Sequence, residues 1–80
     1  ERLQAIERAE AALRRVLTGQ IRVRDHGAGL ARIEVESAQF SVFMENRERL
    51  EREIRDAGFT YVTLDLRGYR TGSQNEMLTK

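Results

Sequence analysis

Hydrophobic residues in the first part of the chain recur at helical spacing, and no proline or glycine interrupts them before Gly19. This spacing predicts a helix from Glu1 to Leu17, because apolar residues three and four positions apart share one helical face. Glu10 lies at the edge of the stripe, so spacing alone also fits a boundary carboxylate that reaches water. The stripe itself contains Leu3, Ile6, Ala9, Leu13, Val16 and Leu17.

The hydrophobic period changes to two between Gln20 and Glu36. Alternation predicts two strands, and Gly27 and Gly29 suit the turn between them because glycine reaches positive φ easily, so a β-hairpin is predicted. Leu30 is an apolar exception on the polar face. The apolar face holds Ile21, Val23, Ala31, Ile33 and Val35. The polar face holds Arg22, Arg24, His26, Arg32, Glu34 and Glu36.

A second helix is predicted after the hairpin, with Ser37 as its N-cap and Gly58 at its end. Its apolar stripe contains Phe40, Phe43, Leu50, Ile54 and Ala57, and its other face alternates acidic and basic residues as a solvated helix face does. The run 60–66 then predicts a third strand, with Val62, Leu64 and Leu66 toward the core and Tyr61, Thr63 and Asp65 on the other face.

These elements predict an α+β fold with the order helix, strand, strand, helix, strand. We expect a three-stranded mixed sheet in two layers, with both helices on one face and the third strand parallel to the second. The helix-free face would then collect the charged side chains of the strands. That face is either a solvated surface with cross-strand ion pairs or the wall of a cleft made with another domain.

Composition narrows the function classes. The net charge is +1, from 14 basic and 13 acidic residues, which lacks the basic excess of a general nucleic-acid binder. The chain has no cysteine, so it contains no disulfide, zinc thiolate or cysteine nucleophile. Neither a membrane span nor a signal-peptide pattern is present, and we expect a cytoplasmic protein. A chain that begins at Glu1 without methionine is expected to be a fragment.

The last residues of the chain differ from the rest in composition and in hydrophobic pattern. Residues 68–80 contain two glycines and small polar residues and lack an apolar period. We therefore expect a small α+β domain over residues 1–67 and a tail over residues 68–80. That tail is predicted to dock on a neighbour or to be disordered.

Three segments together resemble a known family. They are IRVRDHG with LARIEV (21–27 and 30–35), AGFTYVTLDL (57–66) and GYRTGSQNE (68–76). In this order they resemble the C-terminal domain of the PP-loop ATP pyrophosphatases that act as ATP-dependent sacrificial sulfur transferases in the maturation of the nickel-pincer cofactor of lactate racemase. The resemblance covers nearly the whole chain, although Ala28 and Gly29 make the hairpin loop about one residue longer than usual in the family.

The resemblance implies where the chemistry lies. In the family an N-terminal PP-loop domain binds ATP with Mg²⁺, and a cysteine supplies sulfur. This chain lacks both the Ser-Gly-Gly-x-Asp-Ser loop and any cysteine, so it is expected to be inactive alone. By motif match, Arg22 and Arg24 are implied as binders of phosphate or substrate, because a guanidinium offers a bidentate fork to such anions. Arg32 is a further candidate, from its place on the same sheet face. Glu10 and Glu34 are implied as candidates for catalytic or metal-facing roles.

Three functional hypotheses follow. The first is an accessory C-terminal domain that lines the cleft of a sulfur transferase, beside a PP-loop domain and a phosphate-bearing dinucleotide substrate, and that supports a homo-oligomer. The second is a stand-alone protein- or RNA-interaction module that uses the polar sheet face. The third is oligomerisation alone, through a sheet edge or the first helix. His26, Asp65 and Tyr61 stay open between structural and site roles.

Overall fold

Three strands form one mixed sheet in the computed structural model, which describes residues 2–70. Strand order is β1-β2-β3, with β1 (Ile21–Asp25) antiparallel to β2 (Leu30–Val35) and β2 parallel to β3 (Tyr61–Leu64). The hairpin register pairs Arg22 with Glu34 and Arg24 with Arg32. The predicted α+β class, the strands and the parallel pairing are confirmed.

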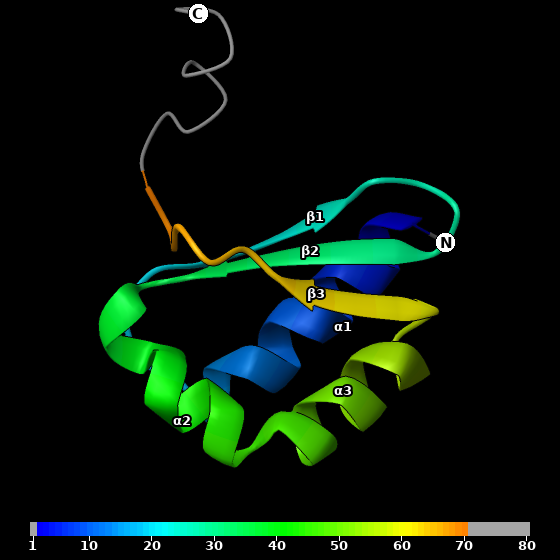
Figure 1. Ribbon diagram of the computed structural model, residues 1–80. Helices are drawn as coiled ribbons and strands as arrows, with labels where there is room; N and C mark the ends of the chain where they lie inside the picture. The colour runs from blue at the N-terminus through cyan, green and yellow to red at the C-terminus, as the bar shows by residue number, and fades with distance from the viewer. Residues whose placement is uncertain (1, 71–80) are drawn as a thin grey trace, which may run out of the picture.

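The helices lie together on one face of the sheet, as Figure 1 shows. They are α1 (Arg2–Arg14), α2 (Phe40–Glu45) and α3 (Arg47–Asp56), with a short 3-10 turn η1 (Ser37–Gln39) before α2. The core lies between the two layers. Its fully enclosed side chains include Leu13, Ile33, Leu50, Ile54 and Val35, and these are the apolar positions that the two hydrophobic periods select. Among residues 2–70, no helix is long and apolar enough to cross a membrane.

The single second helix that the sequence predicts is broken at Asn46. This residue has φ −111° and ψ 19°, outside the helical region, and its side-chain amide donates to the carbonyl of Val42 at 2.8 Å. Asparagine competes with helical hydrogen bonds in this way, which explains the change of direction between α2 and α3. The predicted N-cap is also wrong, because Ser37 is the first residue of η1 and the preceding Glu36 makes no side-chain cap.

Two predicted core residues lie outside the core. Leu66 follows β3, which ends at Leu64, and is 80% exposed. Leu3 lies in the first turn of α1 and is also mostly exposed, so the buried stripe of that helix begins further along the chain. In both cases the periodicity continues past the end of the surface that could bury it.

The chain remains attached to the sheet for a few residues after β3. A turn closes with Gly68 N donating to the carbonyl of Asp65, and Tyr69 N then donates to the carbonyl of Val35 at 2.8 Å. Gly68 has φ +81°, and a Cβ there would come within 3.1 Å of the Val35 carbonyl oxygen. The domain's own contacts therefore reach Tyr69, and positions 71–80 of the predicted tail lie outside the described residues.

Candidate functional site on the helix-free face of the sheet

The charged side chains predicted to share the helix-free face do lie together there. Arg22 and Arg24 come from β1, Arg32 and Glu34 from β2, and Asp65 follows β3. They share a face because alternate residues of a strand point the same way and because the register places Arg24 opposite Arg32. The central strand thus carries one cation and one anion between two outer strands.

Glu34 is the centre of this cluster. Its side chain is only 1% exposed, although it belongs to the polar face. Oε2 lies 3.1 Å from a terminal nitrogen of Arg32 and 3.5 Å from Nε of Arg24. A buried carboxylate is costly unless cations lie beside it, and here two guanidinium groups compensate it. Glu34 therefore fixes the position of two of the three strand arginines.

Arg32 also connects the cluster to the end of β3. Its second terminal nitrogen donates to Oδ2 of Asp65 at 3.2 Å. Beside it, the Thr63 hydroxyl donates to the carbonyl of Ala31 at 2.7 Å, which occupies this side chain within the sheet. Tyr61 is 59% exposed at the margin of the face. Asp65 thus orients Arg32, whereas Thr63 has a structural contact.

Several polar atoms of the cluster are buried without a well-aligned hydrogen bond. They are Nε of Arg24, Nε of Arg32 and both carboxylate oxygens of Glu34, of which Oε2 forms the two ion pairs. Buried polar atoms in this state are uncommon in folded proteins and call for an explanation. The cluster retains hydrogen-bonding capacity that the described residues do not use.

Arg22 differs from the other two strand arginines. It is exposed, and the structure shows no ion pair for it within residues 2–70. Together with Arg24, Arg32 and His26 it borders a shallow hollow of about 440 Å³ along β1. An open guanidinium beside two fixed ones is suited to an anionic ligand, because arginine keeps its charge and offers parallel N–H donors.

Glu10 lies apart from Glu34, on the other side of the sheet. It belongs to α1, and its Oε2 accepts a hydrogen bond from the backbone N–H of Val23 at 3.2 Å. Its other oxygen lies 3.7 Å from Arg14. Residues 2–70 contain no group of three His, Asp or Glu side chains that could hold a metal ion. The structure places one of these carboxylates on a strand N–H and the other beside guanidinium groups, and the catalytic or metal-facing roles of Glu10 and Glu34 stay predictions.

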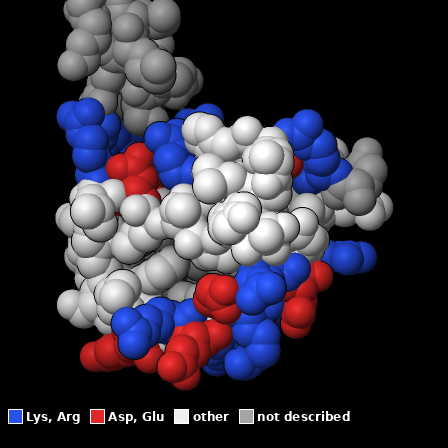
Figure 2. Space-filling model, turned by 45° about the vertical axis from the view of Figure 1, so that its right-hand side comes forward, with Lys and Arg blue, Asp and Glu red and all other residues white. Residues whose placement is uncertain are grey.

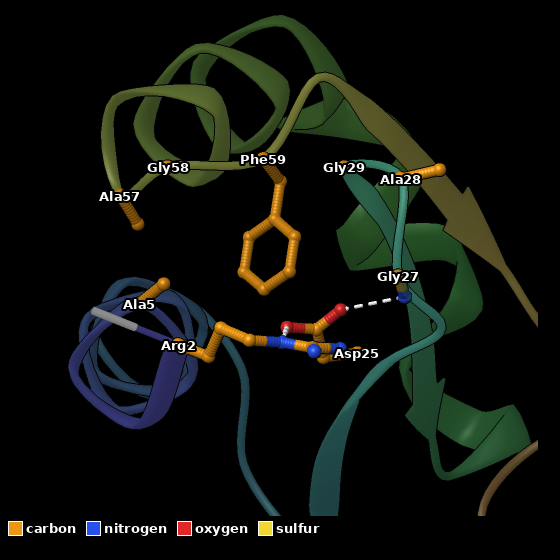
Figure 3. A pocket seen from close by; sticks show the side chains of 9 residues that line it. All are labelled: Arg2, Ala5, Asp25, Gly27, Ala28, Gly29, Ala57, Gly58 and Phe59. Atoms are coloured by element: carbon orange, nitrogen blue, oxygen red, sulfur yellow. Dashed lines mark hydrogen bonds and ion pairs between the residues drawn. The ribbon is translucent and has the colours of Figure 1, made fainter.

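A second hollow, of about 380 Å³, lies at the turn end of the hairpin (Figure 3). Figure 3 shows the Phe59 ring pointing into it and the Arg2 side chain meeting Asp25, whose Oδ2 lies 2.9 Å from Nε of Arg2. Asp25 also accepts from Gly27 N at 2.8 Å. The Arg2 hydrogen bond, followed by that of Gly27, lowers the pKa of Asp25 below its ordinary value. The sequence analysis did not single out Asp25, and only the position of α1 reveals this pair.

Comparison with known proteins supports the motif-based interpretation. The chain is 44% identical over 82 residues to an uncharacterized protein of Synechocystis sp., and 43% identical over 72 residues to pyridinium-3,5-bisthiocarboxylic acid mononucleotide synthase of Lactiplantibacillus plantarum. The matches cover 100% and 90% of this chain but only 30% and 26% of the two relatives. No protein-family model matches the chain.

The match to the synthase confirms the resemblance predicted from the motifs. Identity of 43% along 90% of the chain indicates common descent of this segment. The chain spans less than a third of the length of either relative, so what the whole synthase does is a property of that longer protein. The chain is thus a homologue of one part of this synthase.

Proposed function

We propose that this chain is the accessory C-terminal domain of an ATP-dependent sulfur transferase, and that its helix-free sheet face forms one wall of the active-site cleft. The observation that carries the proposal is the arginine cluster, in which buried Glu34 fixes Arg24 and Arg32 while Arg22 stays open. A sheet holds such groups more precisely than a loop does. The relationship to the synthase adds the kind of chemistry to which this face would contribute.

The expected ligand of this face is an anionic substrate. A carboxylate or phosphate would meet Arg22 first, and the partly exposed guanidinium groups of Arg24 and Arg32 would offer further donors beside it. Charge-assisted hydrogen bonds of this kind are stronger than neutral ones. The cluster holds three guanidinium groups against the carboxylates of Glu34 and Asp65, so one positive charge remains for the ligand.

The remaining machinery belongs to the rest of the proposed enzyme. ATP and Mg²⁺ are assigned to an N-terminal PP-loop domain, because this chain has neither the phosphate-binding glycine loop nor the cysteine that the reaction requires. Support of a homo-oligomer and a cytoplasmic location belong to the same proposal. The role of this chain is to bind and orient substrate, and it carries no bond-breaking step.

The test is the substitution Arg22→Ala in the full-length enzyme. Loss of one charge-assisted contact is worth about 1.5–3 kcal/mol, which corresponds to roughly a ten- to a hundredfold lower kcat/KM for sulfur transfer. Arg22 is exposed, so we expect the free energy of unfolding to change by no more than about 0.5 kcal/mol. Arg24→Ala does not separate activity from stability, because it also removes a partner of buried Glu34 and should lower the free energy of unfolding.

Arg52→Ala provides the control. Arg52 is exposed on α3, in the other layer of the molecule, and its loss should alter neither activity nor the thermal midpoint. Full sulfur-transfer activity of the Arg22→Ala enzyme would remove the substrate role from this face. An activity loss fully explained by a lower fraction of folded enzyme would make the arginine structural.

A further inference from the structure

Within residues 2–70, no backbone group pairs with the outward groups of β3 at its outer edge. Tyr61 N donates to the carbonyl of Gly29 at 2.9 Å, and Asp65 N donates to that of Ile33 at 2.9 Å, so these residues turn their amides toward β2. Alternation then turns the N–H and C=O of Val62 and Leu64 away from the sheet, toward the open edge. An edge of this kind is a template for another strand.

An apolar groove lies directly along this edge. It has a volume of about 390 Å³ and runs between β3 and helices α2 and α3, with Phe43, Met44, Val62 and Leu64 as its apolar lining and Arg47 and Glu48 at its rim. Met44 is 51% exposed. Figure 2 shows an uncharged band over β3, above the charged surface of the helices. The groove and the edge therefore adjoin, because Val62 and Leu64 belong to both.

We propose that this surface binds a second copy of the same chain, through antiparallel pairing of β3 with the partner subunit's β3. The two-fold axis would pass beside Thr63, so that Val62 pairs with the partner subunit's Leu64 and Leu64 with the partner subunit's Val62. These are the residues whose N–H and C=O groups point outward, and reciprocal bonds between them would join the two sheets into one. Isologous pairing of this kind is the common arrangement in symmetric dimers.

Side-chain placement fits the same axis. In an antiparallel pair, directly opposed residues point to the same face, so Val62 and the partner subunit's Leu64 would both face the helix layer. The two grooves would then merge, and Met44 would be covered by its symmetry mate. Tyr61, Thr63 and their mates would lie on the helix-free face, and β3 itself carries no charge that would repel its copy.

Charge at the groove rim favours a copy over an unrelated acidic or basic partner. The rim carries Arg47 together with Glu48 and Glu51, so one patch contains both signs. A patch of one sign would repel itself across a two-fold axis, whereas a mixed patch can place its arginine against a carboxylate of its copy. This inference rests on the β3 edge and not on Arg22, so either proposal can fail alone.

The experiment is sedimentation equilibrium on the 80-residue chain over a range of concentrations, with amide hydrogen exchange on the same samples. We expect a reversible dimer and slower exchange of the Val62 and Leu64 amides as the concentration rises. The double variant Tyr61→Lys with Met44→Lys changes two side chains that are more than half exposed, so folding should persist. It should raise the dimer dissociation constant at least about tenfold, because edge lysines oppose strand pairing.

Leu3→Lys is the matched control, because Leu3 is an equally exposed apolar residue that lies on α1. It should leave the dissociation constant unchanged, and circular dichroism would verify that each variant is folded. A chain that stays monomeric at all concentrations overturns the proposal. So does a dimer that the double variant leaves intact. Protection of the Val62 and Leu64 amides in a monomer would also overturn it, since another segment of the same chain would then cover the edge.

Discussion

The two edge strands of the sheet differ in how their outward backbone groups are protected. At the β1 edge, Glu10 of α1 accepts the outward N–H of Val23, and Arg2 of the same helix pairs with Asp25. At the β3 edge, no residue among 2–70 covers the outward groups of Val62 and Leu64 with a hydrogen bond, and the strand is uncharged. Edge strands in natural proteins are usually protected by charge or by a covering element. The described part of the chain thus protects its β1 edge by itself, and the β3 edge is the one for which we propose a partner.

The largest difference between the two edges is expected when proline replaces an edge residue with an outward N–H on each strand. Val23→Pro removes the N–H that Glu10 accepts and a buried valine side chain, and should cost about 3 kcal/mol or more of unfolding free energy. Val62→Pro removes an N–H for which residues 2–70 provide no acceptor, and should cost about 1 kcal/mol.

Urea unfolding at low protein concentration measures both changes, because the monomer then dominates. Equal losses at the two edges would mean that β1 and β3 are protected alike. A loss at β3 that grows with protein concentration would place an interface there and strengthen the contrast.

A smaller effect is expected from Glu10 itself. Glu10→Ala leaves the Val23 N–H without its acceptor and should lower the unfolding free energy by about 1–2 kcal/mol. Glu10→Gln keeps an acceptor oxygen and should lose less than half of that. Glu7→Ala, at an exposed position of the same helix, is the control. If all three variants lose the same amount of unfolding free energy, the carboxylate does not protect the edge.

A stable Glu10→Gln variant that is inactive in the full-length enzyme would give this residue the catalytic role implied by resemblance.

The smallest expected effect is a pH dependence at the protected edge. The pKa of Asp25 is lowered in the folded state by Arg2 and by Gly27 N, so its stabilising contribution is present above the ordinary aspartate pKa of about 4. That contribution is lost as the pH falls through the lowered folded value. Thermal midpoints between about pH 6 and pH 2 should therefore fall less steeply for Asp25→Asn than for the unmodified chain.

Some acid dependence should remain in the Asp25→Asn variant. Arg49 first and Arg15 second lower the pKa of Glu53 in the helical layer. The substitution at Asp25 does not affect these contacts of Glu53. Identical pH profiles for the two proteins would show that the Arg2–Asp25 contact does not act on stability.

The hydrophobic periods predicted the layers of the fold because burial on one side of an element leaves a direct trace in sequence. Val23, Ile33 and Ile54 are all buried where the pattern placed them. The break at Asn46 was missed because the apolar stripe continues across it, although asparagine inside a helix was the available signal. Leu66 was misplaced because alternation does not indicate where the covering helices stop.

The candidate site was predicted as a set of residues but not as an arrangement. Alternation placed Arg22, Arg24, Arg32 and Glu34 on one face, and the structure confirms this placement. It could not show that Glu34 is enclosed, because that depends on a diagonal contact with Arg24 and on the reach of two long side chains. The role of Glu10 at the β1 edge depends on how a helix crosses a strand, and no local pattern encodes that.

Gly68 determines the direction in which the chain leaves the domain. Its φ of +81° and its missing side chain allow the backbone to return to β2 after the turn, where Tyr69 N reaches the Val35 carbonyl. A larger residue at this position would press on that carbonyl and displace the strand end. A single methyl group at Gly68 is therefore expected to strain this turn and to weaken the hydrogen bond that attaches Tyr69 to β2.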